Sequence, residues 1–111
     1  ITMKIIDCKF VSADKRTRVV GGFYIDFIST ENVIKDDMFK IVYEDKSHYF
    51  KATDISIVDK NLKISAIETG YWGNKFDRMS DLDIRNLIDL PIIKETDENI
   101  IANIRTQSTY C

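Results

Sequence analysis

Four short segments of β-branched and aromatic residues follow one another between residues 38 and 68, separated by brief polar turns. Such spacing is typical of successive antiparallel strands. The clearest pair of successive strands lies in the range Ile55–Ile67, on the two sides of the turn Asp59-Lys60-Asn61. Apolar and polar residues alternate along the second strand of this pair: Leu62, Lys63, Ile64, Ser65, Ala66. This range therefore predicts a β-hairpin, in which we expect Asn61 to take the left-handed conformation.

The N-terminal third predicts two more strands. The expected strands of the whole chain are Met3–Val11, Arg18–Ile28, Met38–Tyr43, His48–Ala52, Asp54–Val58 and Leu62–Glu68. Ser12–Thr17 is polar and predicts a turn, as does the segment Glu44–Ser47. Gly21-Gly22 predicts a bulge or bend inside a strand. Residues 29–37 predict a loop with one helical turn, capped by Ser29 or Thr30.

The expected fold is α+β and mainly β: a curved antiparallel meander, or an SH3-like partly open barrel, of about six strands. Isoleucine dominates the apolar residues while leucine and alanine are scarce, which favours strands over helices. At 111 residues the chain is expected to form a single domain. Exposed sheet edges are a hazard at this size, and we expect Lys40, Lys51 and Lys63 to guard them.

The C-terminal third has a different pattern. An aromatic loop is expected at 70–79, short helices at 80–105 and a frayed tail at 106–111. Ser80 is the expected cap of the first helix, with Leu87 on its apolar stripe. Pro91 ends that helix early. Residues 97–105 form a second helix or, alternatively, a final strand, because isoleucine suits both.

Charge and cysteine content limit the classes of partner and compartment. The net charge of −2 provides no global field that attracts nucleic acid or an anionic membrane. Only two cysteines are present, Cys8 and Cys111, so we expect reduced thiols and a cytoplasmic location. No apolar run reaches the roughly 18 residues of a membrane span, and we expect no membrane contact.

The aromatic loop is the leading candidate site. Tyr71, Trp72 and Phe76 lie within six residues of one another, beside Lys75 and Arg78. Rigid rings near cations are typical of binding hot spots, so these five residues are the expected partner-binding residues. The alternative is that the rings cap the open end of the sheet and belong to the core.

Single-stranded nucleic-acid binding on the sheet face is the alternative function. Lys15, Arg16 and Arg18 form the tightest basic cluster, and we place them in a hairpin turn. The overall acidity argues against strong binding, because phosphate contacts supply most of the affinity. A nucleic-acid partner is therefore not expected, and a solvated turn is the simpler interpretation.

Catalytic and metal-binding patterns are weak. His48 is the single histidine, and we expect it near the surface at the start of a strand. No Gly-x-Ser-x-Gly elbow is present, and a pair of Cys8 with His48 has no supporting signature. Two distant cysteines and one histidine do not match a zinc site. We expect no enzyme activity, no metal and no cofactor.

These features favour a small non-catalytic protein-binding module. Its expected partner is another protein, and a homodimer through a sheet edge is a further possibility. Small stand-alone proteins of this kind are often inhibitors, immunity factors or adaptors. The composition, rich in Ile, Lys, Asp and Asn and poor in Ala and Pro, suits an AT-rich bacterial or phage genome. A small ligand in the barrel mouth is the third hypothesis.

Overall fold

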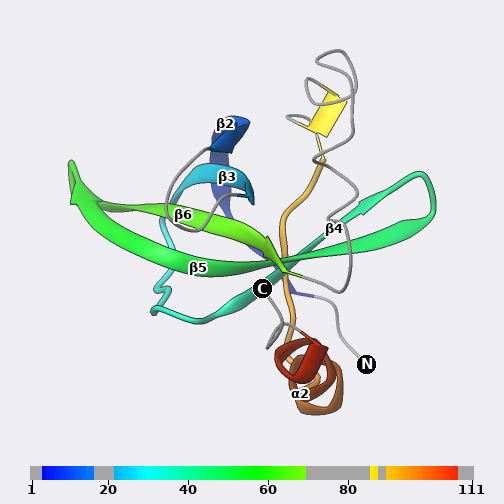
Figure 1. Ribbon diagram of the computed structural model, residues 1–111. Helices are drawn as coiled ribbons and strands as arrows, with labels where there is room; N and C mark the ends of the chain where they lie inside the picture. The colour runs from blue at the N-terminus through cyan, green and yellow to red at the C-terminus, as the bar shows by residue number, and fades with distance from the viewer. Residues whose placement is uncertain (1–3, 17–21, 70–85, 88–89, 108–111) are drawn as a thin grey trace.

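The computed structural model describes residues 4–16, 22–69, 86–87 and 90–107. Its elements in chain order are β1 (Lys4–Ile5), β2 (Cys8–Arg16), β3 (Gly22–Ser29), β4 (Met38–Tyr43), β5 (Lys46–Val58), β6 (Asn61–Thr69), β7 (Ile93–Lys94) and α2 (Glu98–Gln107). The strands form one antiparallel sheet that curls into a half-barrel, and α2 lies to one side of it (Figure 1). The expectation of a mainly-β, barrel-like α+β fold is confirmed.

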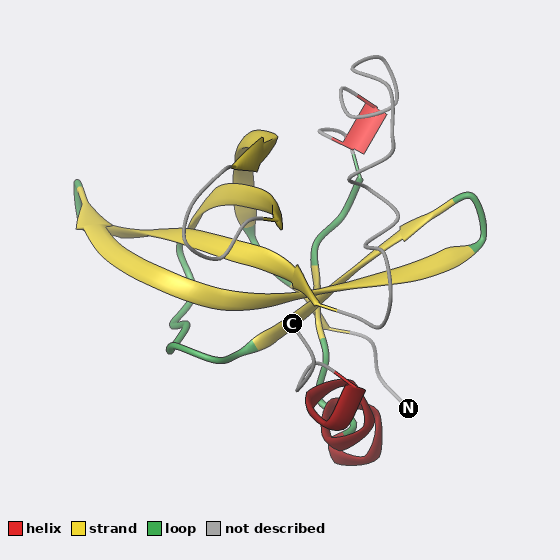
Figure 2. Ribbon diagram, viewed as in Figure 1, coloured by secondary structure: helices red, strands yellow, loops and turns green. Residues whose placement is uncertain are grey.

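The order of strands explains the curl. Within the sheet the strands are arranged β1-β7-β4-β5-β6-β3-β2. β1 and β2 are consecutive in the chain, separated only by Ile6 and Asp7, yet they stand at opposite ends of this order. One stretch of chain therefore begins by pairing with β7 and continues by pairing with β3. This arrangement brings the two ends of the sheet together, and only β4–β5–β6 is a simple meander (Figure 2).

The inner face of the curled sheet holds the hydrophobic core. Its fully buried members alternate along the strands, as expected for one face of a sheet. They are Phe23, Ile25, Phe27, Phe39, Ile41, Phe50, Ala52, Ile64 and Ala66. The rings of Phe27 and Phe39 meet edge-to-face with centroids 5.3 Å apart, a favoured geometry for aromatic pairs. Leu87 is also fully buried in this core.

Two hairpins with tight turns join β4, β5 and β6. Glu44 and Asp45 link the first pair and have φ of 50° and 63°. Asp59 and Lys60 link the second pair, with φ of 50° and 75°. Two consecutive positive φ values define turns that match the twist of the flanking strands. The predicted hairpin over Ile55–Ile67 is confirmed, but its left-handed residues are Asp59 and Lys60, whereas Asn61 already belongs to β6.

Two predicted strands form a single strand in the structure. His48–Ala52 and Asp54–Val58 are both parts of β5, which has 13 residues. The register with β6 shifts between Ala52 and Asp54, so Thr53 is the extra residue of a β-bulge. Its hydroxyl donates to the carbonyl oxygen of Ser65 at 3.1 Å. The polar Thr53 thus bends the strand without ending it.

The N-terminal turn was placed wrongly from sequence. β2 continues to Arg16, and Asp14 and Lys15 pair with Tyr24 and Phe23, so the range Ser12–Thr17 is strand as far as Arg16. Pairing with β3 stabilises this polar segment, which alternation alone did not predict. Gly22 is the first residue of β3 rather than a bend inside it, and Gly21 lies outside the described residues.

A second irregularity lies on β2. The register between β2 and β3 shifts between Phe10 and Ser12, which makes Val11 a bulge residue. Within the described strands, breaks in regular pairing therefore lie at β2 and β5.

The segment 30–37 contains no helical turn. Ser29 is fully buried, and its hydroxyl oxygen accepts a hydrogen bond from the backbone N–H of Glu31 at 3.0 Å. Asp37 Oδ2 accepts from the N–H of Ile34 at 3.1 Å. These short side chains satisfy backbone donors locally, which favours turns over helix.

The second predicted helix is confirmed as α2, and the strand alternative for this region is wrong. Asp97 Oδ1 accepts from the N–H groups of Asn99 and Ile100 at 2.9 and 3.4 Å, as an N-cap does. Ile104 is buried, and Ile100 is half-buried on the same face. Of the first predicted helix only Asn86 and Leu87 are described, and both are helical. The remaining positions of that helix lie outside the described residues.

The core predicts a large effect of Phe39→Ala. Removal of a fully buried ring should lower the free energy of unfolding by about 3–5 kcal/mol. Phe39→Leu, which keeps most of the volume, should lower it by less than about 1.5 kcal/mol. Denaturant unfolding followed by circular dichroism measures both. Val42→Ala, at an exposed position of the same strand, is the control, and a loss equal to that of Phe39→Ala would contradict this core.

The first hairpin turn predicts a stabilising substitution. Glycine adopts positive φ without a Cβ clash, so Asp45→Gly should raise the free energy of unfolding by about 0.5–1 kcal/mol. Lys63→Gly, in the interior of β6, should lower it by about the same amount. Thermal unfolding of the two variants checks the contrast; destabilisation by both would show that Asp45 does not have its left-handed conformation.

Candidate functional site

The aromatic loop cannot be compared with the structure. Tyr71, Trp72, Lys75, Phe76 and Arg78 all lie outside the described residues. Their role as a partner-binding site therefore stays a prediction. The candidate site of the described residues lies elsewhere, on β5.

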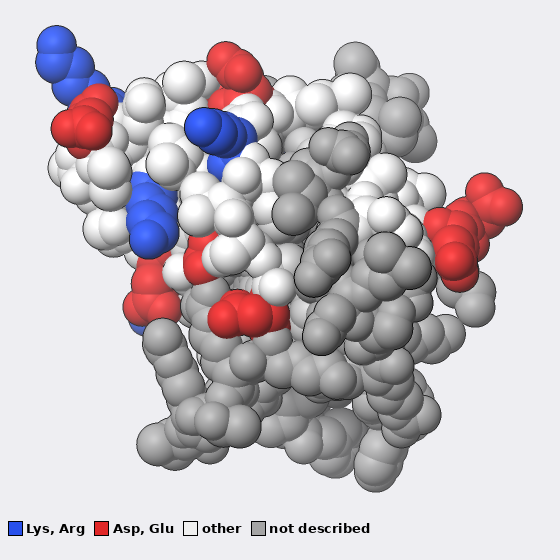
Figure 3. Space-filling model, turned by 90° about the horizontal axis from the view of Figure 1, so that it is seen from above, with Lys and Arg blue, Asp and Glu red and all other residues white. Residues whose placement is uncertain are grey.

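The basic cluster has a different setting from the one predicted. Lys15 and Arg16 lie on β2, opposite Phe23 and Gly22 of β3, and Arg18 lies outside the described residues. The first two are thus strand residues, and the predicted hairpin turn is wrong for them. Charges of both signs are interspersed over the described part of the face in Figure 3.

His48 is buried rather than near the surface, which corrects the sequence-based expectation. β5 already begins at Lys46, so His48 falls on the inner face with Phe50. Its Nδ1 lies 3.4 Å from Glu68 Oε2, and the two side chains are only 8% and 4% exposed. Glu68 itself pairs across strands with Phe50. Because both groups face the packed interior, we assign this pair to the interior packing of β5 on β6.

Cys8 and His48 lie on strands that are not neighbours. Cys8 is on β2, opposite Ser29 of β3. His48 is on β5, opposite Ile41 of β4. In the order of the sheet, β6 and β3 stand between β5 and β2.

The setting of Cys8 makes it a weak nucleophile. Burial raises the pKa of its thiol above the usual value, and the negative charges of Asp7 and then Glu31 raise it further. The thiolate is the reactive form of cysteine, so a raised pKa leaves little of it at neutral pH.

A serine–aspartate cluster lies on the outer face of β2, β3 and β6. Asp26 accepts hydrogen bonds from the hydroxyl groups of Ser12 and Ser65, at 2.9 and 2.6 Å, one on each carboxylate oxygen. Asp26 is only 8% exposed. Because one carboxylate links three adjacent strands, the cluster fixes their relative register. Its geometry therefore indicates a structural role.

The most unusual feature of the sheet is the edge of β5 beyond the bulge. β4 pairs with β5 only as far as Lys51. At Ala52 the loop of residues 30–37 replaces β4 as the hydrogen-bonding neighbour of β5. Asp36 N–H donates to the Ala52 carbonyl, and Ala52 N–H donates to the Asp37 carbonyl, both at 2.9 Å. From Asp54 to Val58, within the part of the chain that the structure describes, β6 is the only strand beside β5. We call Asp54–Val58 the open edge.

The hairpin turn decides which backbone groups the open edge presents. In a hairpin with a two-residue turn the closing residues, here Val58 and Asn61, form a hydrogen-bonded pair. Pairs alternate, so Ser56 is also bonded to β6, while Ile55 and Ile57 direct their N–H and C=O groups away from it. On the other side of the bulge, Ala52 also directs its backbone groups away from β6, where they bond to Asp36 and Asp37. The open edge thus presents two donors and two acceptors.

The side chains beside these groups are apolar, and two of them are exposed. Ile57 is 78% exposed and Val58 38%. Ile55 is half-buried and lies opposite Ile64, on the core side of the sheet. The hairpin that carries them projects from the body of the molecule, at the left of Figure 1. Ile34, 64% exposed, belongs to the loop that flanks the open edge at Ala52.

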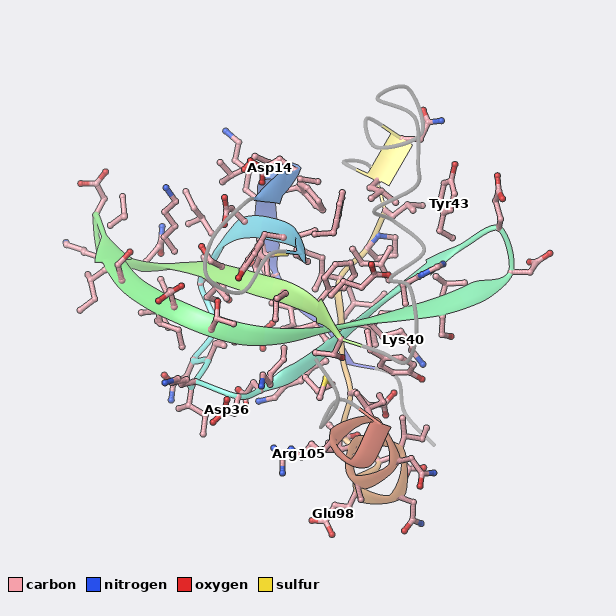
Figure 4. The ribbon with its side chains drawn as sticks, viewed as in Figure 1. Asp14, Asp36, Lys40, Tyr43, Glu98 and Arg105 are labelled. Carbon is pink, nitrogen blue, oxygen red and sulfur yellow. The ribbon has the colours of Figure 1, made fainter. Side chains whose placement is uncertain are left out.

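Charged residues lie at the two ends of the open edge. Asp36 and Asp54 are exposed near its start, and Lys60 is exposed in the turn that follows it. Figure 4 shows the Asp36 side chain on the loop below the hairpin. The predicted guards Lys40, Lys51 and Lys63 do not lie on this edge, because each has paired strands on both sides. The guard prediction is therefore wrong for the edge that is open.

Sequence reasoning missed the open edge because it divided β5 in two. The signal was present as Ile55-Ser56-Ile57-Val58, an alternating segment without Lys or Pro that runs up to the turn. A strand of this length next to the six residues of β4 must extend beyond its neighbour.

Comparison of the chain with protein-family models, with curated proteins and with solved structures gives no match. None of the helices described is long and apolar enough to cross a membrane. Across the described ranges, no three His, Cys, Asp or Glu side chains are grouped so that they could hold a metal ion.

The environment of Cys8 predicts slow alkylation. In a Cys111→Ser background, the rate of reaction with iodoacetamide should increase with pH up to values above the usual pKa of cysteine. Asp7→Asn removes one of the charges that raise the pKa of Cys8, so its rate profile should shift to lower pH. Mass spectrometry of timed samples measures the rates, with Asp14→Asn as the control. An unchanged profile in Asp7→Asn would contradict this assignment.

Proposed function

We propose that this chain is a protein-binding module that accepts an extended segment of a partner along the open edge of β5. The observation that carries the proposal is the combination of outward-facing backbone groups at Ile55 and Ile57 with the 78% exposure of the Ile57 side chain. Strand addition uses these two features: main-chain hydrogen bonds supply affinity, and alternate side chains supply specificity.

The exposure of Ile57 has a free-energy consequence. Full burial of an isoleucine side chain stabilises by about 1.5–3 kcal/mol. Each additional backbone hydrogen bond contributes a net 0.5–1.5 kcal/mol or so. An incoming strand that covers Ile57 and bonds to Ile55 and Ile57 gains both contributions. The segment best suited to this edge has apolar residues at alternate positions, because Ile55 and Ile57 lie on one face of the sheet.

The geometry also distinguishes strand addition from binding at a flat surface. A partner on a flat surface would need the exposed side chains but not the backbone groups. Proline at position 57 removes an outward N–H while the ladder to β6 stays complete, because Ile57 does not bond to β6. Proline at this position therefore tests the edge as a whole, because it removes both the outward N–H and the exposed isoleucine side chain.

A fluorescein-labelled peptide of alternating valine and threonine, flanked by lysines, tests the proposal by anisotropy titration. We expect saturable binding to the wild type, and at least about a 10-fold weaker affinity for Ile57→Pro, from the loss of one edge hydrogen bond and of the isoleucine side chain. Val42→Thr, which alters an exposed apolar residue on β4, should bind like the wild type. Unfolding midpoints of all three proteins establish that they are folded.

Two results would contradict strand addition. One is the absence of peptide binding by the wild type at millimolar concentration. The other is equal binding by the wild type and Ile57→Pro, which would place the peptide elsewhere on the surface.

A further inference from the structure

We propose that a second copy of this chain occupies the open edge when no partner strand is bound, with the two β5 strands antiparallel about a twofold axis at Ser56. The inference rests on the proposed function, because it names one strand that the edge accepts. A symmetric pair requires that the same patch be complementary to itself.

The backbone groups are self-complementary. With the axis at Ser56, Ile55 of one copy lies opposite Ile57 of the other. Both residues direct their N–H and C=O groups outward, so each opposed pair exchanges two hydrogen bonds, as a hydrogen-bonded antiparallel pair does. Symmetry gives two such pairs and four hydrogen bonds. Ser56 of one copy lies opposite Ser56 of the other. Its backbone N–H and C=O groups need no new partner, because they bond to β6 of the same copy.

The apolar side chains meet on one face. Ile55 and Ile57 of each copy lie on the core side of the sheet, across from Ile64 and Leu62. In the paired arrangement the four isoleucines become cross-strand neighbours, and each Ile57 loses much of its 78% exposure. Cross-strand pairs of β-branched residues are favourable in antiparallel sheets. The most exposed large apolar side chain on the described surface is thus the one that the pairing covers.

The charges are complementary in the same register. Asp54 lies opposite Val58 of the second copy, so no two like charges are directly opposed between 54 and 58. The turn of the second copy reaches the level of Ala52, where Asp36 is fixed by its hydrogen bond to the Ala52 carbonyl. This places exposed Lys60 of the second copy beside exposed Asp36, and symmetry repeats the contact. The proposed register therefore pairs Lys60 with Asp36 at each end, where Asp59 of the same turn is also exposed.

Sedimentation velocity of the full chain between about 1 and 500 μM tests the proposal, in a Cys111→Ser background so that no disulfide can link copies. We expect a reversible monomer–dimer equilibrium. Ile57→Pro and Ile57→Lys should each raise the dissociation constant at least about 30-fold, the first by removal of edge hydrogen bonds and the second by an unpaired charge. Val42→Thr should leave the dissociation constant unchanged.

Charge reversal tests the register. Lys60→Glu alone and Asp36→Lys alone should each weaken the dimer by about 5- to 10-fold, because each places like charges together at both ends. The double variant restores opposite charges and should recover most of the wild-type affinity. A dimer in which the double variant is no stronger than the single ones would overturn the register.

The outcomes separate this inference from the proposed function. A chain that stays monomeric at every concentration but binds the valine–threonine peptide would overturn self-pairing and support strand addition. A dimer unaffected by Ile57→Pro would overturn self-pairing through this edge, and peptide binding would then decide the proposed function on its own. Dissociation of the dimer by added peptide would support both, because one edge cannot pair with two strands at once.

Discussion

The antiparallel ladder between β5 and β6 determines the rest of the structure. β5 is paired with β6 along most of its length but with β4 along only its first half, so the second half has an uncovered side. The two-residue turn at Asp59–Lys60 fixes the alternation of hydrogen bonds along this ladder. That alternation decides that Ile55 and Ile57, rather than Ser56, direct their backbone groups outward. One local turn thus determines the chemistry of a surface several residues away.

The interior of the curled sheet provides stability, and its exterior provides hydrogen bonds between strands and an open edge. Inside, phenylalanine and isoleucine side chains pack around the T-shaped pair of Phe27 and Phe39, and burial of this area supplies most of the stability. Outside, Asp26 ties three strands together through two serine hydroxyls. With β2, β3 and β6 fixed by these contacts, the hairpin of β5 and β6 is held in place while its outer edge stays available. A rigid scaffold with one open edge suits recognition by strand addition.

Much of the fold was predictable because alternation is a local signal. The strand Met38–Tyr43 and the hairpin across Ile55–Ile67 follow directly from it, whereas the isoleucines of residues 97–105 suited both a helix and a strand. Which strands pair is a long-range property that alternation does not encode. The sequence therefore did not predict that β2 extends to Arg16, or that the two strands on either side of Thr53 are one. The buried position of His48 depended on where β5 begins. The open edge depended on the difference in length between β5 and β4, which the division of β5 at Thr53 concealed.

Backbone amide hydrogen exchange, followed by NMR at a concentration where the chain is monomeric, tests the central claim most directly. If the edge of β5 is open, the amides of Ile55 and Ile57 should exchange rapidly with solvent, while those of Ser56 and Val58, bonded to β6, should be protected by the ladder. Equal protection of all four amides in the monomer would show that the chain covers this edge itself, and would contradict its role as a docking surface.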